Sequence, residues 1–274
     1  MDLKQATACL ENVLSMDPAN LDAHNLREQY RLPGCFSDWM GVNTQISTDD
    51  DIFRFFANHP SSKNPVRDYL ADGWRTMMEL HEALGVVDMT LHKCRSFLEF
   101  ASGHGRFTRH LARIFDQGQL TASDVVSGSV EFLQEAMGVK GFYSQPNASD
   151  LKFTEKYDII FVLSLFSHLP VSVWASWLTK LHGSLAPDGL LIFSTHGERC
   201  AVLDCVELPE KGFCFFPSSE SLVLAGEDYG TTFAKLDFVK STVKEALGKQ
   251  VEMHSIPSHF WGRQDAILVR ASQP

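Results

Sequence analysis

The sequence has few of the features that would assign it to a special class of protein. Its six cysteines show no Cys-x-x-Cys and no paired zinc spacing, so we expect no metal site. Lys and Arg number only 24 against 34 Asp and Glu, and a net charge of −10 disfavours a protein that grips nucleic acid. No apolar run approaches the length of a membrane span, and residues 1–5 do not resemble a signal peptide. We therefore expect a soluble cytoplasmic protein with reduced thiols, of undefined oligomeric state.

What the sequence does have is an apolar run that ends in an acid and leads into a tight turn of small residues. The acid is Glu99, and the turn contains Ala101, Ser102, Gly103 and Gly105. Because glycine lacks a Cβ, the chain can turn sharply there and a ligand can approach the main chain. Apolar residues then recur at helical spacing from Phe107 to Phe115, which predicts a helix that packs on a sheet. Such a unit is typical of doubly wound α/β proteins that bind nucleotide-like ligands, and an ordinary strand-to-helix turn is the alternative.

Further apolar runs alternate with amphipathic helices and bring the count to seven strands. After the run before the glycine turn, the expected strands are Gln119–Asp124, Lys140–Ser144, Lys156–Ser164, Leu190–Thr195, Val251–Ile256 and Gln264–Val269. The last two could form an antiparallel edge, while the apolar fourth run is typical of a strand buried on both faces of a parallel sheet. Residues 196–235 interrupt the alternation as an insertion. The pattern predicts an α/β fold with a doubly wound sheet over residues 93–274.

Residues 1–92 are expected to form a helical extension. An apolar stripe, a stop at Asp17-Pro18 and a second helix over Leu21–Tyr30 resemble one hairpin of a tetratricopeptide repeat, and an ordinary helix pair fits as well. One hairpin cannot bury its own apolar face, so it must pack on the main domain or on another chain. Val66–Leu84 predicts a longer helix whose apolar surface is too wide for one face. That helix is either sandwiched or lines a ligand pocket.

Several charged residues near the turn have two possible roles. Asp124 ends the second strand about 20 residues beyond the glycines, where doubly wound folds place a carboxylate against ribose hydroxyls. Its alternative role is a cap for the next helix. Arg106, Arg109 and Arg113 could form a local basic patch, but we expect them to lie on a solvated helix face.

Taken in order, these motifs resemble the class I S-adenosylmethionine-dependent methyltransferases over residues 94–271. Glu99 to Gly105 is similar to the family's first motif, with Ala101 where many members have glycine. Ser149-Asp150-Leu151, residues 157–169 and residues 185–192 are similar to later motifs. The resemblance implies S-adenosyl-L-methionine as the cofactor and a mostly parallel seven-stranded sheet whose last strand is antiparallel.

The resemblance also implies a role for individual residues. The cofactor-binding residues would be Glu99 at the methionine end, Ala101, Ser102, Gly103 and Gly105 in the turn, Asp124 at the ribose, and Val125, Ser149 and Asp150 at the adenine. His168 follows the fourth strand, where strand ends meet the ligand, and is the candidate general base because imidazole titrates near neutral pH. A helix-start residue bonded to the backbone is its alternative role, and His196 is a second candidate base.

Three functional hypotheses remain at this point. A nicotinamide-dinucleotide enzyme is disfavoured because its third glycine would stand at Thr108. Methyl transfer is favoured, with a small-molecule acceptor that is lipid-like or glycan-linked, since the aromatic N-terminal helix and Phe213–Phe216 would give an apolar lid. The alternative is a non-catalytic protein that binds S-adenosylmethionine and docks a partner through its N-terminal hairpin.

Overall fold

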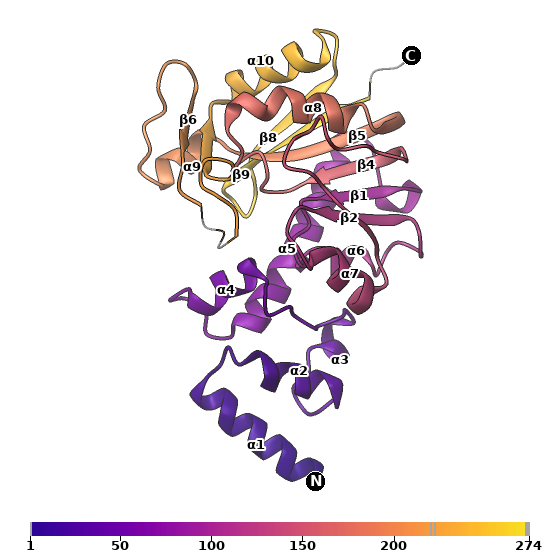
Figure 1. The fold of residues 1–274 in the computed structure, drawn as a ribbon, viewed down its shortest axis with the longest axis vertical. Coiled ribbons are helices and arrows are strands. Elements are labelled where there is room, and N and C mark those ends of the chain that lie inside the picture. Colours follow the sequence, from indigo (N-terminus) through magenta and orange to yellow (C-terminus); the bar gives the residue numbers. More distant parts are fainter. Residues whose placement is uncertain (1, 220, 222, 272–274) are drawn as a thin grey trace.

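A nine-stranded, mostly parallel sheet forms the centre of the molecule in the computed structural model, which describes residues 2–219, 221 and 223–271 (Figure 1). The strands are β1 (Phe97–Phe100), β2 (Leu120–Asp124), β3 (Lys140–Tyr143), β4 (Tyr157–Val162), β5 (Leu185–His196), β6 (Phe213–Phe216), β7 (Thr231–Ala234), β8 (Met253–Phe260) and β9 (Gln264–Arg270). Strands β1 to β5 are parallel, in the order β3-β2-β1-β4-β5. Strand β9 runs antiparallel between β5 and β8, so the predicted α/β fold with an antiparallel last strand is confirmed.

The sheet differs from the prediction at its β5 edge. Strands β6 and β7 lie inside the predicted insertion and extend the sheet, with β7 paired to β5 only where His196 faces Phe233. Such short strands give little periodic signal. Strand β5 also begins five residues before the predicted strand Leu190–Thr195, and the register against β4 shifts in this added part. Sequence alone does not fix these positions, because they depend on which strand is the neighbour.

Helices cover both faces of the sheet and build the N-terminal extension. They are α1 (Leu3–Met16), α2 (Leu21–Gln29), α3 (Ser37–Met40), α4 (Asp51–Asn58), α5 (Pro65–Gly85), α6 (Thr108–Leu111), α7 (Ser129–Met137), α8 (Trp174–His182), α9 (Glu198–Leu203) and α10 (Leu236–Leu247), with 3-10 turns η1 (Leu91–Lys93) and η2 (Val171–Val173). Side chains of Asn20, Asp50 and Asn64 accept backbone N–H groups and so start α2, α4 and α5. Helix α6 is shorter than predicted. No helix among the described residues combines the length and apolar composition that crossing a membrane requires.

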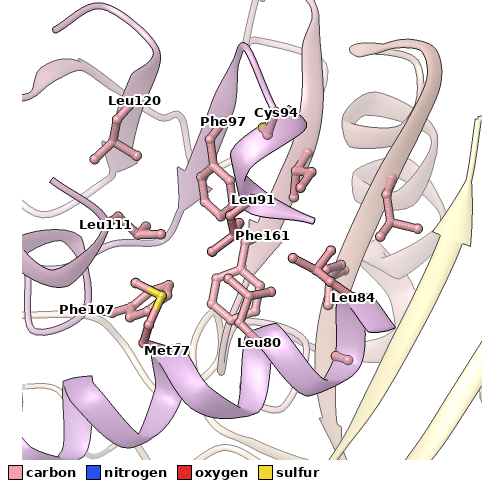
Figure 2. Packing of buried hydrophobic residues seen from close by; sticks show 14 of the residues in the cluster. Met77, Leu80, Leu84, Leu91, Cys94, Phe97, Phe107, Leu111, Leu120 and Phe161 are labelled. Carbon is pink, nitrogen blue, oxygen red and sulfur yellow. The ribbon is translucent and has the colours of Figure 1, made fainter. Parts of the chain in front are cut away.

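Helix α5 has an apolar surface on two sides because it packs against two different clusters. Met77, Leu80 and Leu84 point toward Phe97 and Phe161 of the sheet core (Figure 2). Earlier in the helix, buried residues Val66, Tyr69 and Leu70 pack with Phe53 of α4. Burial of each such side chain is worth about 1.5–3 kcal/mol. The sandwiched interpretation of this helix is therefore correct for most of its apolar residues.

The N-terminal hairpin is present as two helices, but it packs on the molecule unevenly. Helix α1 contacts α2 and has no buried residue, whereas α2 buries Ala23 and His24. Figure 1 shows α1 at the end of the molecule opposite α10. The hairpin is thus attached through α2, and its relation to tetratricopeptide repeats stays a prediction.

Candidate active site

The glycine turn lies between β1 and α6, and its two glycines have different roles. Ala101, Gly103 and Gly105 all have left-handed backbone, with φ of 63°, 55° and 84°, and Ser102 between them is buried. A Cβ on Gly103 would meet no protein atom within 4 Å. A Cβ on Gly105 would lie 2.4 Å from Leu133, so α7 leaves no room there for a side chain. Gly103 is therefore the point at which a ligand can approach the main chain.

Asp124, the last residue of β2, stabilises this turn. Its Oδ2 accepts a hydrogen bond from the N–H of Gly103 at 2.7 Å, and its Oδ1 accepts one from the N–H of Val126 at 2.9 Å. Burial raises the pKa of the carboxyl, and these N–H groups oppose the rise. The helix-cap alternative is wrong, because α7 begins after Gly128 and has no side-chain cap. A carboxylate has about four acceptor sites, so capacity remains for a vicinal diol.

Glu99 lies beneath the turn as a buried acid. The hydroxyl of Thr108 donates to its Oε2 at 2.6 Å. Burial raises the pKa of Glu99 to about 8, and the Thr108 hydrogen bond and the nearby charges of Arg106 and Arg109 oppose that rise. Thr108 therefore has a definite function at the position where a dinucleotide-binding turn would have glycine.

The predicted solvated face is wrong for two of the three arginines. Arg106 forms an ion pair with Asp72 of α5, and its guanidinium lies 4.9 Å from the ring centroid of Trp261. Arg109 is 1% exposed, with hydrogen-bond acceptors in the segment before α4. Arg113 is exposed, as expected. The sequence could not reveal this, because Asp72, Asn43 and Gln45 are tens of residues away from these arginines in the chain.

The residues predicted at the adenine do not all gather at the turn. Val125 is half-buried next to Asp124. Ser149 and Asp150 are exposed in the turn after β3, where Asp150 accepts hydrogen bonds at 3.1 Å from Ser149 and Asn147. Asp150 also borders a cavity of about 290 Å³ between β3 and the segment that follows it. In the structure, therefore, Glu99, Gly103, Gly105 and Asp124 form one group and Asp150 lies within its own turn.

His168 lies beyond the carboxyl end of β4, as predicted. Its ring stacks on Tyr229 with centroids 4.6 Å apart and an angle of 17° between the planes. Its Nδ1 is 2.7 Å from the carbonyl oxygen of Gly230, which can only accept a hydrogen bond. The proton of the neutral ring therefore sits on Nδ1. The hydrogen bond to the backbone that the alternative role required is therefore present, and this bond fixes the tautomer of the ring.

A polar network beside His168 was not predicted. Gln264 opens β9 opposite His196 of β5. Its amide nitrogen donates to Ser164 Oγ at 2.7 Å and lies 3.3 Å from His196 Nε2, while its oxygen accepts from Ser194 Oγ at 2.6 Å. Burial, followed by the charge of His168, lowers the pKa of His196 to about 4, so this histidine is a weak base near neutral pH. Only the register of β9 against β5 could have indicated the group.

Comparison with known proteins gives a match over the strands and helices that build the site. Residues 97–189, from β1 into β5, match the family model described as a methyltransferase domain. The chain contains a methyltransferase domain. The matched range includes the glycine turn, Asp124 and His168, whereas His196, Tyr229 and Gln264 lie outside it.

Relatives of this methyltransferase domain are distant. A malonyl-[acyl-carrier protein] O-methyltransferase of Bacillus cereus is 30% identical over 103 residues, which are 37% of this chain and 38% of that relative. The chain thus spans well under half of that protein's length. An S-adenosylmethionine-dependent methyltransferase from Clostridium acetobutylicum is 14% identical, with a TM-score of 0.50 and coverage of 73% of this chain and 91% of its own. The plantazolicin methyltransferase BamL is 12% identical, with a TM-score of 0.50, and the match covers 81% of this chain and 96% of the BamL chain. The methyltransferase domain therefore has the class I, Rossmann-like fold.

Proposed function

We propose that this protein transfers a methyl group from S-adenosylmethionine to a small-molecule acceptor. The observation that carries the proposal is the glycine turn, where open space beside Gly103 adjoins the buried carboxylate of Asp124. The cofactor would supply an activated methyl group on a sulfonium. A sulfonium ligand has no pyrophosphate and so needs no third glycine at the start of α6, in agreement with Thr108.

The residues at the turn fit the parts of this cofactor. Asp124 would accept hydrogen bonds from the ribose hydroxyls and Glu99 would face the methionine end, directly or through the loop that it orders. Gly103 would bring the backbone close to the cofactor, and Gly105 would allow the turn to pack against α7, with Ala101 and Ser102 in the same cofactor-binding turn. Val125 would lie beside the adenine, and Ser149 and Asp150 would reach it from the turn after β3. The chain would contribute mainly by holding the two reactants together, which can lower a barrier by about 7–11 kcal/mol.

Cofactor binding is the first test. Asp124→Ala is expected to weaken S-adenosylhomocysteine binding by about tenfold or more, because a buried carboxylate that receives two hydroxyl groups is lost. Isothermal titration calorimetry gives the affinity. Asp116→Ala is the matched control, since Asp116 is exposed. Equal affinity in the wild type and the Asp124 variant would refute the ribose assignment.

His168 would accept the proton from a hydroxyl or amine acceptor. With Nδ1–H donated to Gly230, Nε2 is the basic nitrogen of the neutral ring. Labelled S-adenosylmethionine, incubated with hydroxyl, carboxyl and amine compounds in free and lipid-linked forms, would identify the acceptor. His168→Ala is then expected to lower turnover by about 10²–10⁴-fold at saturating acceptor, with unchanged S-adenosylhomocysteine affinity.

Two outcomes would revise this assignment. Full turnover in His168→Ala, matched by the exposed control His92→Ala, would mean that His168 is not the base. Tight S-adenosylhomocysteine binding without any labelled product would favour the alternative, a binding protein that contacts a partner through α1 and α2.

A further inference from the structure

We propose that Arg109 is a positioning residue that connects the cofactor-binding turn to the acceptor side of the site, through Tyr69, Asp50, α4 and the loop that ends at Tyr229 and Gly230. The inference rests on the proposed function, because it concerns the same cofactor and the same histidine. It adds a connection that neither the glycine turn nor His168 contains by itself.

The connection begins at the guanidinium of Arg109, which contacts both sides of a buried interface. Its Nε donates to the carbonyl of Gly105 at 2.9 Å, so it holds the last glycine of the turn. Its Nη1 donates to the carbonyls of Asn43 and Gln45 at 2.8 and 3.0 Å. These acceptors lie in the segment that leads to α4. A rotation of the glycine turn would therefore break hydrogen bonds to the N-terminal extension.

The second step passes through a buried tyrosine. Arg109 Nη2 lies 3.4 Å from the hydroxyl of Tyr69, and the guanidinium stacks 5.2 Å from the centroid of that ring. The same hydroxyl donates to Asp50 Oδ2 at 2.6 Å. Arg109, Tyr69 and Asp50 are all at most 2% exposed. A buried cation and a buried anion are thus joined by one hydroxyl, an arrangement that tolerates little displacement of any member.

The third step crosses α4 to the loop between β6 and β7. Asp50 Oδ1 accepts the N–H of Phe53 and so begins α4. Its neighbour Asp51 accepts a hydrogen bond at 2.9 Å from the hydroxyl of Ser221. Asp50 therefore connects the start of α4 to Arg109 through Tyr69, and Asp51 connects it to the loop through Ser221.

The loop ends on the candidate base. The N–H of Gly230 donates to the carbonyl of His168 at 2.9 Å, while His168 Nδ1 donates to the carbonyl of Gly230 at 2.7 Å. Tyr229 stacks on the same imidazole. Ser221 thus attaches the loop to α4, and Tyr229 and Gly230 attach its end to His168. Contacts connect the cofactor turn to Ser221, and the polypeptide chain itself leads from there to the residues that hold the proton-accepting ring.

Hydrogen exchange measured by mass spectrometry, with and without S-adenosylhomocysteine, tests this connection. In the wild type, the ligand is expected to slow exchange at residues 43–58 and 223–233 as well as at the glycine turn. Tyr69→Phe keeps the ring but removes the hydroxyl, and should bind the ligand within about threefold of the wild type. It should lose most of the added protection at residues 50–58 and 223–233, and keep it near residues 43–45, whose carbonyls Arg109 contacts directly. Ser221→Ala should lose it only in residues 223–233. Tyr30→Phe, at an exposed position, is the matched control and should behave as the wild type.

Each result decides one question. A wild-type protein that binds S-adenosylhomocysteine but is protected only around residues 99–126 would overturn the connection and leave the proposed function intact. Unchanged protection in Tyr69→Phe would overturn the role of Arg109 and Tyr69. Failure of the wild type to bind the ligand in calorimetry would overturn the proposed function, and the connection with it. Because Ser221 lies outside the core, its variant tests the outer part of the connection even where Tyr69→Phe does not fold.

Discussion

Glu99 is an almost completely buried acid, and this burial has a measurable consequence. Its pKa in the folded protein is about 8, against 4.5 for an ordinary glutamate. Between these values the folded protein binds a proton that the unfolded chain releases. The contribution of this carboxyl to the free energy of unfolding should therefore fall as pH rises from about 4.5 to 8, by an amount on the order of a few kcal/mol.

Glu99→Gln is expected to remove this pH dependence. The amide keeps an oxygen that can accept the Thr108 hydroxyl but carries no titrating proton. In urea unfolding at a series of pH values from 5 to 8.5, the stability of the variant relative to the wild type should therefore increase with rising pH. Glu135→Gln, at an exposed position of α7, should leave the wild-type slope unchanged. An identical slope in Glu99→Gln would show that this carboxyl is not the group that titrates.

Ala101 illustrates a different single-residue effect. Its φ of 63° is a left-handed conformation in which a Cβ costs roughly 1–2 kcal/mol relative to glycine. The N–H groups of Ala101 and Ser102 nevertheless both donate to the carbonyl of Ser123, so the strand pairing maintains the conformation. The sequence identified Ala101 as a departure from the family pattern, and the structure gives its physical cost.

At Gly73, helix α5 lies so close to the chain after the glycine turn that no side chain would fit between them. A Cβ added to Gly73 would lie 2.3 Å from the carbonyl oxygen of Arg106 and 2.8 Å from the ring of His110. Gly73→Ala is therefore expected to destabilise the protein by about 1–3 kcal/mol in urea unfolding. Gly85→Ala, at the end of the same helix, would meet no atom within 4 Å and should cost little or nothing. Equal stability of the two variants would contradict this packing.

The elements that the sequence predicted well are those with local signals. Apolar runs located β1, β2 and β4, and the acid that ends β2 was recognised by its distance from the glycines. Strands β6 and β7 were missed because they stand outside the alternation of strands and helices, and their place in the sheet depends on pairing with each other and on one contact with β5. The shortened α6 has a related cause, since Arg113 and Ile114 donate to carbonyls three residues earlier and tighten the chain into turns.

The candidate site was predictable only in part, for the same reason. Glu99 and Asp124 belong to motifs read along the chain, and the structure brings both to the turn. Gln264 and Tyr229 reach the site only through the pairing of β9 and the path of the loop. The prediction that Arg106 and Arg109 lie on a solvated face was wrong, because charge alone does not reveal their partners in residues 43–72. Contacts between the N-terminal extension and the turn are thus a property of the whole molecule.

The two ends of the N-terminal extension should therefore differ in what they contribute. Helix α1 buries no residue, so removal of residues 2–16 is expected to change the midpoint of thermal unfolding by no more than about 2 °C and to leave S-adenosylhomocysteine affinity unchanged. Removal of residues 2–46 would also delete buried Ile46 and the carbonyls that Arg109 contacts. That longer truncation leaves a buried cation short of acceptors and should lower both stability and affinity. Equal losses in the two truncations would mean that α1 itself supports the fold, in conflict with its exposure.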